Sequence, residues 1–153
     1  MFKQLLLATL LATGCAAQAN DTPTTASEPT TAERMASARD AIKAKKWKDA
    51  IGELKIAVRE EPKNADAHNL LAYSYRKQAT PDLPQAFEHY NTALRLNPQH
   101  KGAHEYIGEA YLMDNKPLEA EKHLAALEKI CGNKTCEEYA DLSKAIAAYK
   151  AKK

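Results

Sequence analysis

The residues that could perform chemistry in this chain are five histidines, three cysteines and several adjacent acids. Cys131 and Cys136 are separated by four residues, whereas disulfide oxidoreductases carry two cysteines separated by two residues within a βαβ unit. His100 and His104 lie four residues apart, but the sequence between them indicates a helix start, and no further metal ligand stands at a suitable spacing. We therefore expect no enzyme activity, no metal site and no cofactor. A redox or metal protein built on Cys131 and Cys136 remains the alternative.

The same two cysteines also permit a structural interpretation. A turn of four intervening residues can bring two Cα atoms within bridging range, and an oxidising compartment would favour the bond. Loop-closure entropy makes such a bridge worth roughly 2 kcal/mol. We interpret Cys131 and Cys136 as a disulfide that holds a terminal helix in place.

The first 19 residues are typical of an export signal. Lys3 gives a positive start, and the apolar run over residues 5–12 is too short to span a bilayer. Ala17-Gln18-Ala19 fits the small-x-small rule of signal peptidase, whereas residues 12–15 resemble the bacterial lipobox, in which Cys15 would be lipidated. Both sites predict a protein of the bacterial periplasm, either soluble or tethered to the membrane through Cys15.

Residues 20–30 are rich in Thr and Pro and lack any large apolar side chain. Such a segment cannot bury enough surface to offset the entropy of ordering its chain. The composition predicts a disordered linker.

The remainder of the chain repeats itself at about 34 residues. Three alanines recur at spacings of 36 and 34: Ala50, Ala86 and Ala120. A helix-stopping residue follows each of them by twelve positions: Pro62, Pro98 and Gly132. Upstream, the pattern His68-x-x-Leu71-Ala72-x-x-Tyr75 matches His104-x-x-Ile107-Gly108-x-x-Tyr111 position for position.

These positions resemble the tetratricopeptide repeat (TPR) family over residues 31–134, as repeats 31–64, 65–100 and 101–134. His68 and His104 replace the Trp of the family pattern, repeat 1 matches mainly in its second helix, and the hairpin turn of repeat 2 has two extra residues. The resemblance implies an all-α, right-handed α-solenoid of three helical hairpins. A last helix within residues 135–150 would cap it, because four apolar side chains share one of its faces: Tyr139, Leu142, Ile146 and Tyr149.

The resemblance also implies a concave groove lined by the first helix of each hairpin. The groove positions carry over to Met35, Arg39, Ile42, Asn69, Tyr73, Arg76, Glu105, Glu109 and Leu112. Met35, Tyr73 and Glu109 replace the lysines and asparagines with which some family members hold a C-terminal carboxylate. A groove that is basic at one end and acidic at the other favours an extended or helical peptide of mixed charge.

We therefore expect a periplasmic adaptor that binds a protein or peptide partner, with envelope assembly as a suitable setting. The net charge of +2 gives no indication of nucleic-acid binding. Membrane contact is expected through a lipid on Cys15 alone. Self-association of the short solenoid, as a homo-oligomer, is the structural alternative.

Overall fold

The structure of the protein is a computed structural model that describes residues 27–152. These residues form seven α-helices and no strand. The predicted signal peptide, Cys15 and residues 20–26 of the predicted linker lie outside the described residues. No helix within the described part is both long and apolar enough to cross a membrane.

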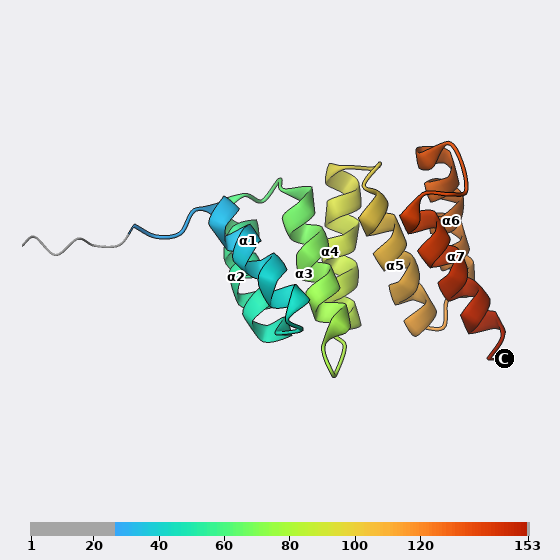
Figure 1. Cartoon of the computed structure of the whole chain (residues 1–153), viewed down its shortest axis with the longest axis horizontal. Helices are drawn as coiled ribbons and strands as arrows, with labels where there is room; N and C mark the ends of the chain where they lie inside the picture. The colour runs from blue at the N-terminus through green and yellow to red at the C-terminus, as the bar shows by residue number, and fades with distance from the viewer. Residues whose placement is uncertain (1–26, 153) are drawn as a thin grey trace, which may run out of the picture.

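The helices form three antiparallel hairpins and a final single helix. Their bounds are α1 (Thr31–Lys43), α2 (Trp47–Glu60), α3 (Ala65–Lys77), α4 (Leu83–Leu96), α5 (Lys101–Met113), α6 (Pro117–Cys131) and α7 (Glu137–Lys150). Figure 1 shows α1, α3, α5 and α7 side by side in one layer, with α2, α4 and α6 in a second layer behind them. The predicted fold class, a helical solenoid with a capping helix, is confirmed.

The turns reflect the local sequence. The hairpin turns of the first and third hairpins are three residues long, 44–46 and 114–116, and each contains a residue with positive φ, Lys45 or Asn115. The second hairpin turn spans residues 78–82, which is two residues longer, as the repeat alignment predicts. Asp82 ends that turn and caps α4 by accepting a hydrogen bond from the Gln85 amide at 3.1 Å.

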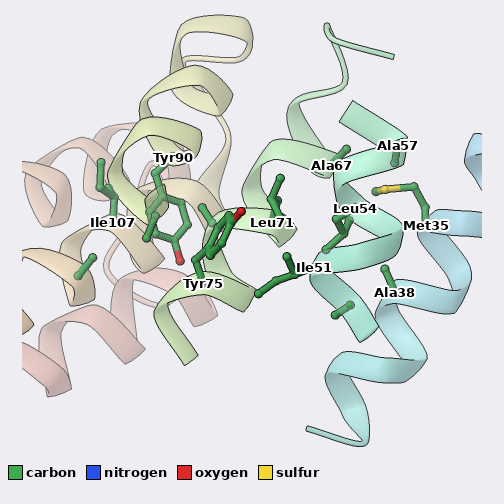
Figure 2. Close-up of a cluster of buried hydrophobic side chains, with 14 residues drawn as sticks. Met35, Ala38, Ile51, Leu54, Ala57, Ala67, Leu71, Tyr75, Tyr90 and Ile107 are labelled. Carbon is green, nitrogen blue, oxygen red and sulfur yellow. The ribbon is translucent and has the colours of Figure 1, made fainter. Parts of the chain in front are cut away.

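The repeated small residues allow the paired helices to approach closely. Ala50, Ala86 and Ala120 are fully buried. The large side chains between them form one apolar cluster that extends from α1 to α5, with Leu54, Leu71 and Tyr90 at its centre (Figure 2). Burial of this stripe requires a neighbouring hairpin on each side, and the stacked arrangement provides it.

The capping helix α7 covers the open side of the last hairpin. Leu142 and Ile146 are buried in a second apolar cluster with Leu112, Ala120 and Leu127. Leu142 packs directly over Gly108: a Cβ atom at Gly108 would lie 2.7 Å from both methyl carbons of Leu142. The absence of a side chain at Gly108 therefore sets how closely α7 approaches α5.

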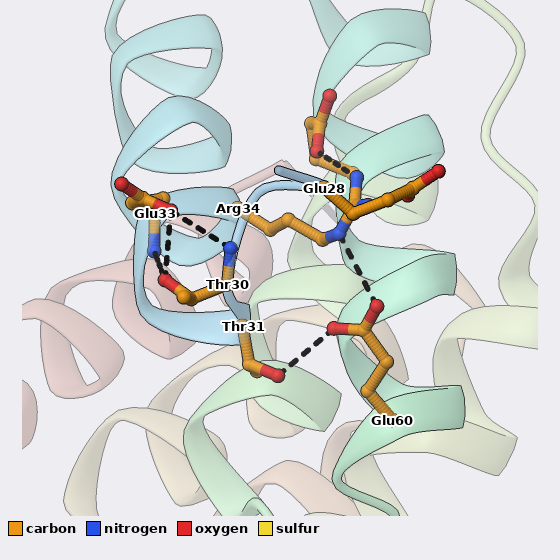
Figure 3. A network of polar contacts seen from close by, with 7 residues as sticks. Glu28, Thr30, Thr31, Glu33, Arg34 and Glu60 are labelled. Atoms are coloured by element: carbon orange, nitrogen blue, oxygen red, sulfur yellow. Dashed lines mark hydrogen bonds and ion pairs between the residues drawn. The ribbon is translucent and has the colours of Figure 1, made fainter. Parts of the chain in front are cut away.

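Arg34 explains why the first hairpin departs from the repeat pattern. It occupies the position that His68 and His104 hold in the later hairpins, and its side chain is 7% exposed. The guanidinium lies 3.1–3.4 Å from three carboxylates, those of Glu28, Glu53 and Glu60 (Figure 3). An ion cluster thus replaces aromatic packing at the N-terminal end.

The last residues of the predicted linker also belong to this end of the fold. Glu28 pairs with Arg34, and Thr30 is the N-cap of α1. Thr30 and Glu33 form a capping box, in which the Thr30 hydroxyl accepts from the Glu33 amide and the Glu33 carboxylate accepts from the Thr30 amide. The part of the segment nearest α1 therefore contributes to helix initiation.

Candidate functional site

The helices α1, α3, α5 and α7 together form one surface, which we name the A-helix face. Five of the nine side chains predicted to line it are buried: Met35, Asn69, Arg76, Glu105 and Leu112. Ile42, Tyr73 and Glu109 are half-buried, and Arg39 is exposed. Met35 and Leu112 differ from the prediction because they pack into the two apolar clusters and contribute to the core.

Arg76 joins three helices beneath this face. Its Nη2 lies 2.6 Å from the Glu109 carboxylate on α5, and its Nε donates to the Tyr90 hydroxyl on α4 at 3.3 Å. The guanidinium also lies over the rings of Tyr73 and Tyr106, 5.4 and 5.7 Å from their centroids. The charge of Arg76, which the sequence assigns to the groove, is therefore matched within the protein by Glu109.

A row of aromatic rings runs from the first residue of α2 across α3 to α5. The ring centroid of Tyr73 on α3 lies 6.1 Å from that of Trp47 and 4.7 Å from that of Tyr106 on α5. The Lys77 ammonium lies 5.8 Å from the Tyr73 centroid. The sequence did not predict three residues of this surface: Trp47, Tyr106 and Lys77. Tyr106 and Lys77 each follow a predicted groove position by one residue. Together they give the face flat, half-buried aromatic surfaces.

Glu105 is the most unusual charged group of the face. It is 8% exposed, and no hydrogen bond or ion pair within the described residues satisfies it. Burial raises the pKa of Glu105 to about 8, with further contributions from the carboxylates of Glu109, Asp141 and Glu138. Glu138 and Asp141 belong to α7, so the capping helix contributes to the electrostatics of this site.

Asn69 is a second unsatisfied polar group. It is 5% exposed, and its Oδ1 is buried without a hydrogen-bond partner among the described residues. Its Nδ2 lies beside Gly102, one helical turn before Glu105 on α5. Asn69 therefore has an unpaired acceptor beside α5, one helical turn before Glu105, which forms no hydrogen bond or ion pair with another described residue.

The histidines form two equivalent pairs between the helices of the second and third hairpins. The Nδ1 atoms of His68 and His89 lie 3.0 Å apart, and His68 Nε2 lies 3.1 Å from the Pro62 carbonyl oxygen. A carbonyl can only accept, so His68 Nε2 carries a proton, and in the neutral ring His68 Nδ1 then accepts from His89 Nδ1. The third hairpin repeats both contacts at 2.9 Å with His104, His123 and Pro98. These histidines connect helices and do not contribute to the A-helix face.

Cys131 and Cys136 lie at the junction of α6 and α7. Their sulfur atoms are 2.08 Å apart, the distance of a disulfide bond, and their Cα atoms are 6.3 Å apart. With Glu138 they make up the one group within the described residues whose donor atoms gather closely enough to suggest a metal site. Bonded sulfurs carry no thiolate for a metal, so this geometry favours a covalent link between helices.

Comparison with solved structures shows the same fold in proteins of low sequence identity. The first TPR domain of human RPAP3 superposes with a TM-score of 0.66 at 19% identity, covering 80% of this chain and 97% of that one. The type III secretion translocator chaperone SycD of Yersinia enterocolitica gives a TM-score of 0.72 at 17% identity, covering 82% and 96%. The TPR2B domain of yeast Sti1 gives 0.71 at 14% identity, covering 80% and 98%. None of the curated proteins matches the sequence.

The family model described as tetratricopeptide repeat matches residues 35–90 and 81–134, which together span most of the described chain. The hairpin geometry, the buried alanines and this match agree, and the chain belongs to the tetratricopeptide repeat family.

Proposed function

We propose that this protein is an exported scaffold that binds a protein or peptide partner on its A-helix face and performs no chemical reaction. The observation that carries the proposal is the aromatic row of Trp47, Tyr73 and Tyr106, next to the unsatisfied Asn69 Oδ1 and the buried carboxyl of Glu105. Half-buried aromatic rings beside unpaired acceptors are typical of surfaces that a second chain completes. Among the described residues, neither Trp47 nor Tyr73 belongs to the two apolar clusters, whereas Tyr106 also packs against the first of them.

Two of the structural neighbours support a binding role. The Sti1 domain was solved in a complex with pHsp70, and SycD is a translocator chaperone. Both are proteins that hold other proteins, and they share the architecture of this chain.

The proposed site of action is the bacterial periplasm, during envelope assembly. It rests on the leader-like residues 1–19 and on the two processing sites that precede the described residues. Intact mass measurement of the protein purified from bacterial membranes and from periplasm tests it. A lipid-modified chain starting at Cys15 supports tethering, a chain starting at Asn20 supports a soluble form, and an unprocessed cytoplasmic chain contradicts export.

Site-directed photo-crosslinking tests the binding face. A photo-reactive amino acid replaces Tyr73 on the A-helix face or, as the matched control, Lys122 on α6, whose side chain is exposed. We expect adducts with another protein at position 73 and few at position 122. Equal yields at the two positions would show that the A-helix face is not the binding surface.

Self-association is a second candidate, and the turn between α5 and α6 favours it. Leu118 is 71% exposed and Met113 is 44% exposed, and both are large apolar side chains. Light scattering over a range of concentrations tests this candidate, because a concentration-independent mass of one chain contradicts it.

A further inference from the structure

The charges of the A-helix face do not balance. Arg76 is paired with Glu109 at 2.6 Å, so its positive charge is matched within the protein. Glu105 remains beside Glu109, Asp141 and Glu138 with no cation paired to it among the described residues. Glu138 and Asp141 therefore leave an excess of negative charge where α5 meets α7, and Glu105 adds to it when it loses its proton.

The described donor atoms of this acidic region do not gather as a compact metal site requires. Donor atoms of three acidic, histidine or cysteine groups gather within 4.8 Å at one place in the described chain, and that group contains neither Glu105 nor Asp141. Calcium requires six or more oxygen ligands close together. A side-chain cation with several N–H donors fits this region better than a metal ion, because its donors can reach acceptors that lie apart.

The rings beside Glu105 suit a long cationic side chain. Glu105 acts electrostatically on Tyr106, and burial together with this carboxylate raises the pKa of Tyr106 to about 12. Arg76 already shows how such a side chain is accommodated, since its guanidinium lies over Tyr73 and Tyr106 and reaches an acid beyond them. Aromatic faces next to carboxylates bind arginine and lysine well.

We propose that the partner segment carries a basic side chain, arginine or lysine, that enters between α5 and α7, pairs with Glu105, Glu138 and Asp141 and lies along Tyr106. The buried Oδ1 of Asn69, unpaired among the described residues, provides a further acceptor one helical turn away. The inference rests on the proposed function, because it specifies the chemistry of a partner bound to the same face. The inference therefore predicts a positively charged partner segment. Family members with a lysine clamp instead hold a negatively charged C-terminal carboxylate.

A pH signature follows from the surroundings of Glu105. The groups that face it are Glu109 on α5, Arg76 and Tyr73 on α3, and Glu138 and Asp141 on α7. A cation beside Glu105 favours its ionised form, so binding at pH 7 releases a proton from a carboxyl whose pKa is about 8. The affinity is expected to rise between pH 7 and pH 8.5.

Selection from a displayed library of random 12-residue peptides tests the inference with the processed protein. The expected result is enrichment of peptides with arginine or lysine at a fixed position. Enrichment of acidic peptides, or of peptides without a charge preference, would overturn the cation site but leave the binding face standing. Recovery of no peptide at all would overturn both this inference and the proposed function.

Binding of the enriched peptides to variants then locates the cation. We expect Glu105→Gln and Asp141→Asn each to weaken peptide binding about tenfold. Glu105→Gln should also reduce the rise in affinity above pH 7. Glu137→Gln is the matched control, because it removes the same charge from an exposed position on α7. Equal affinities for the Glu105→Gln and Glu137→Gln variants would contradict the proposal. Circular dichroism of each variant confirms that its helices are intact.

Discussion

His68 and His89 face each other across the second hairpin with their Nδ1 atoms 3.0 Å apart, and His104 and His123 repeat this relationship in the third. When all four rings are neutral, the two members of each pair share one N–H in a single hydrogen bond. Burial lowers the pKa of all four histidines, and for His123, which His104 also affects, to about 4. The two pairs make the solenoid sensitive to acid.

Acidification from pH 7 to pH 5 should therefore lower the free energy of unfolding. Unfolded histidines bind protons below about pH 6.5, whereas the folded ones do so only at lower pH. Their stabilising contribution is complete above pH 6.5 and is lost as the pH falls through the folded pKa values. We expect a loss of about 2 kcal/mol or more, measured by urea unfolding at several pH values. In the His89→Gln/His123→Gln variant the dependence on pH should be weaker, and an equal slope would contradict the assignment.

Glu105→Gln should stabilise the protein at alkaline pH. The folded pKa of Glu105 is raised to about 8, so the folded state retains a proton that the unfolded state loses above about pH 4.5. Glu105 thus lowers stability as the pH rises from 4.5 through 8. The substitution should increase the unfolding free energy by about 1 kcal/mol at pH 8.5, after allowance for solvent screening, and by much less at pH 5. A gain of the same size from Glu137→Gln would mean that general charge reduction is responsible.

Gly108→Ala should loosen the capping helix. The added Cβ atom would lie 2.7 Å from both methyl carbons of Leu142, which is fully buried and cannot turn away freely. We expect a loss of about 1–3 kcal/mol in thermal or urea unfolding. Gly52→Ala on α2 is the control: a Cβ atom at Gly52 would have no neighbour within 4 Å among the described residues, so this change should stabilise by about 0.5–1 kcal/mol. Similar losses from both substitutions would contradict the role of the Gly108–Leu142 contact.

Reduction of the bond between Cys131 and Cys136 should lower the stability of the protein. The bond closes a short loop between α6 and α7, so the expected loss is roughly 2 kcal/mol. Cys131→Ser/Cys136→Ser should match the reduced wild type in unfolding experiments. A variant that stays stable but loses a redox activity would instead support the oxidoreductase alternative.

The periodic features of the fold could be predicted from the sequence because they recur. The buried alanines, the helix stops and the longer second turn all follow from comparing one repeat with the next. The histidine pairs could also have been found in this way, since His68 and His104 recur together with His89 and His123. Contact within each pair depends on how the two helices of a hairpin pack, which the repeat spacing alone does not give.

The chemistry of the A-helix face could be predicted less completely. A helical period assigns Arg76 and Glu109 to one side of their helices but does not show that they meet, because their contact depends on the spacing between hairpins. The same limit applies to Asp141, whose effect on Glu105 depends on how α7 packs over α5. Met35 and Leu112 lie in the apolar clusters although the helical period assigns them to the face. Their side chains are long enough to reach the neighbouring helix.

The two apolar clusters have a consequence for native-state hydrogen exchange. The first extends from α1 to α5 and the second contains α6 and α7, while Tyr111 packs against both. Such a division allows α6 and the capping helix α7 to open as a cooperative unit while α1 to α5 stay folded. Opening would carry Glu138 and Asp141 away from Glu105 and leave Trp47 and Tyr73 in place. Release of a bound cationic segment could thus proceed by fraying from the C-terminal end.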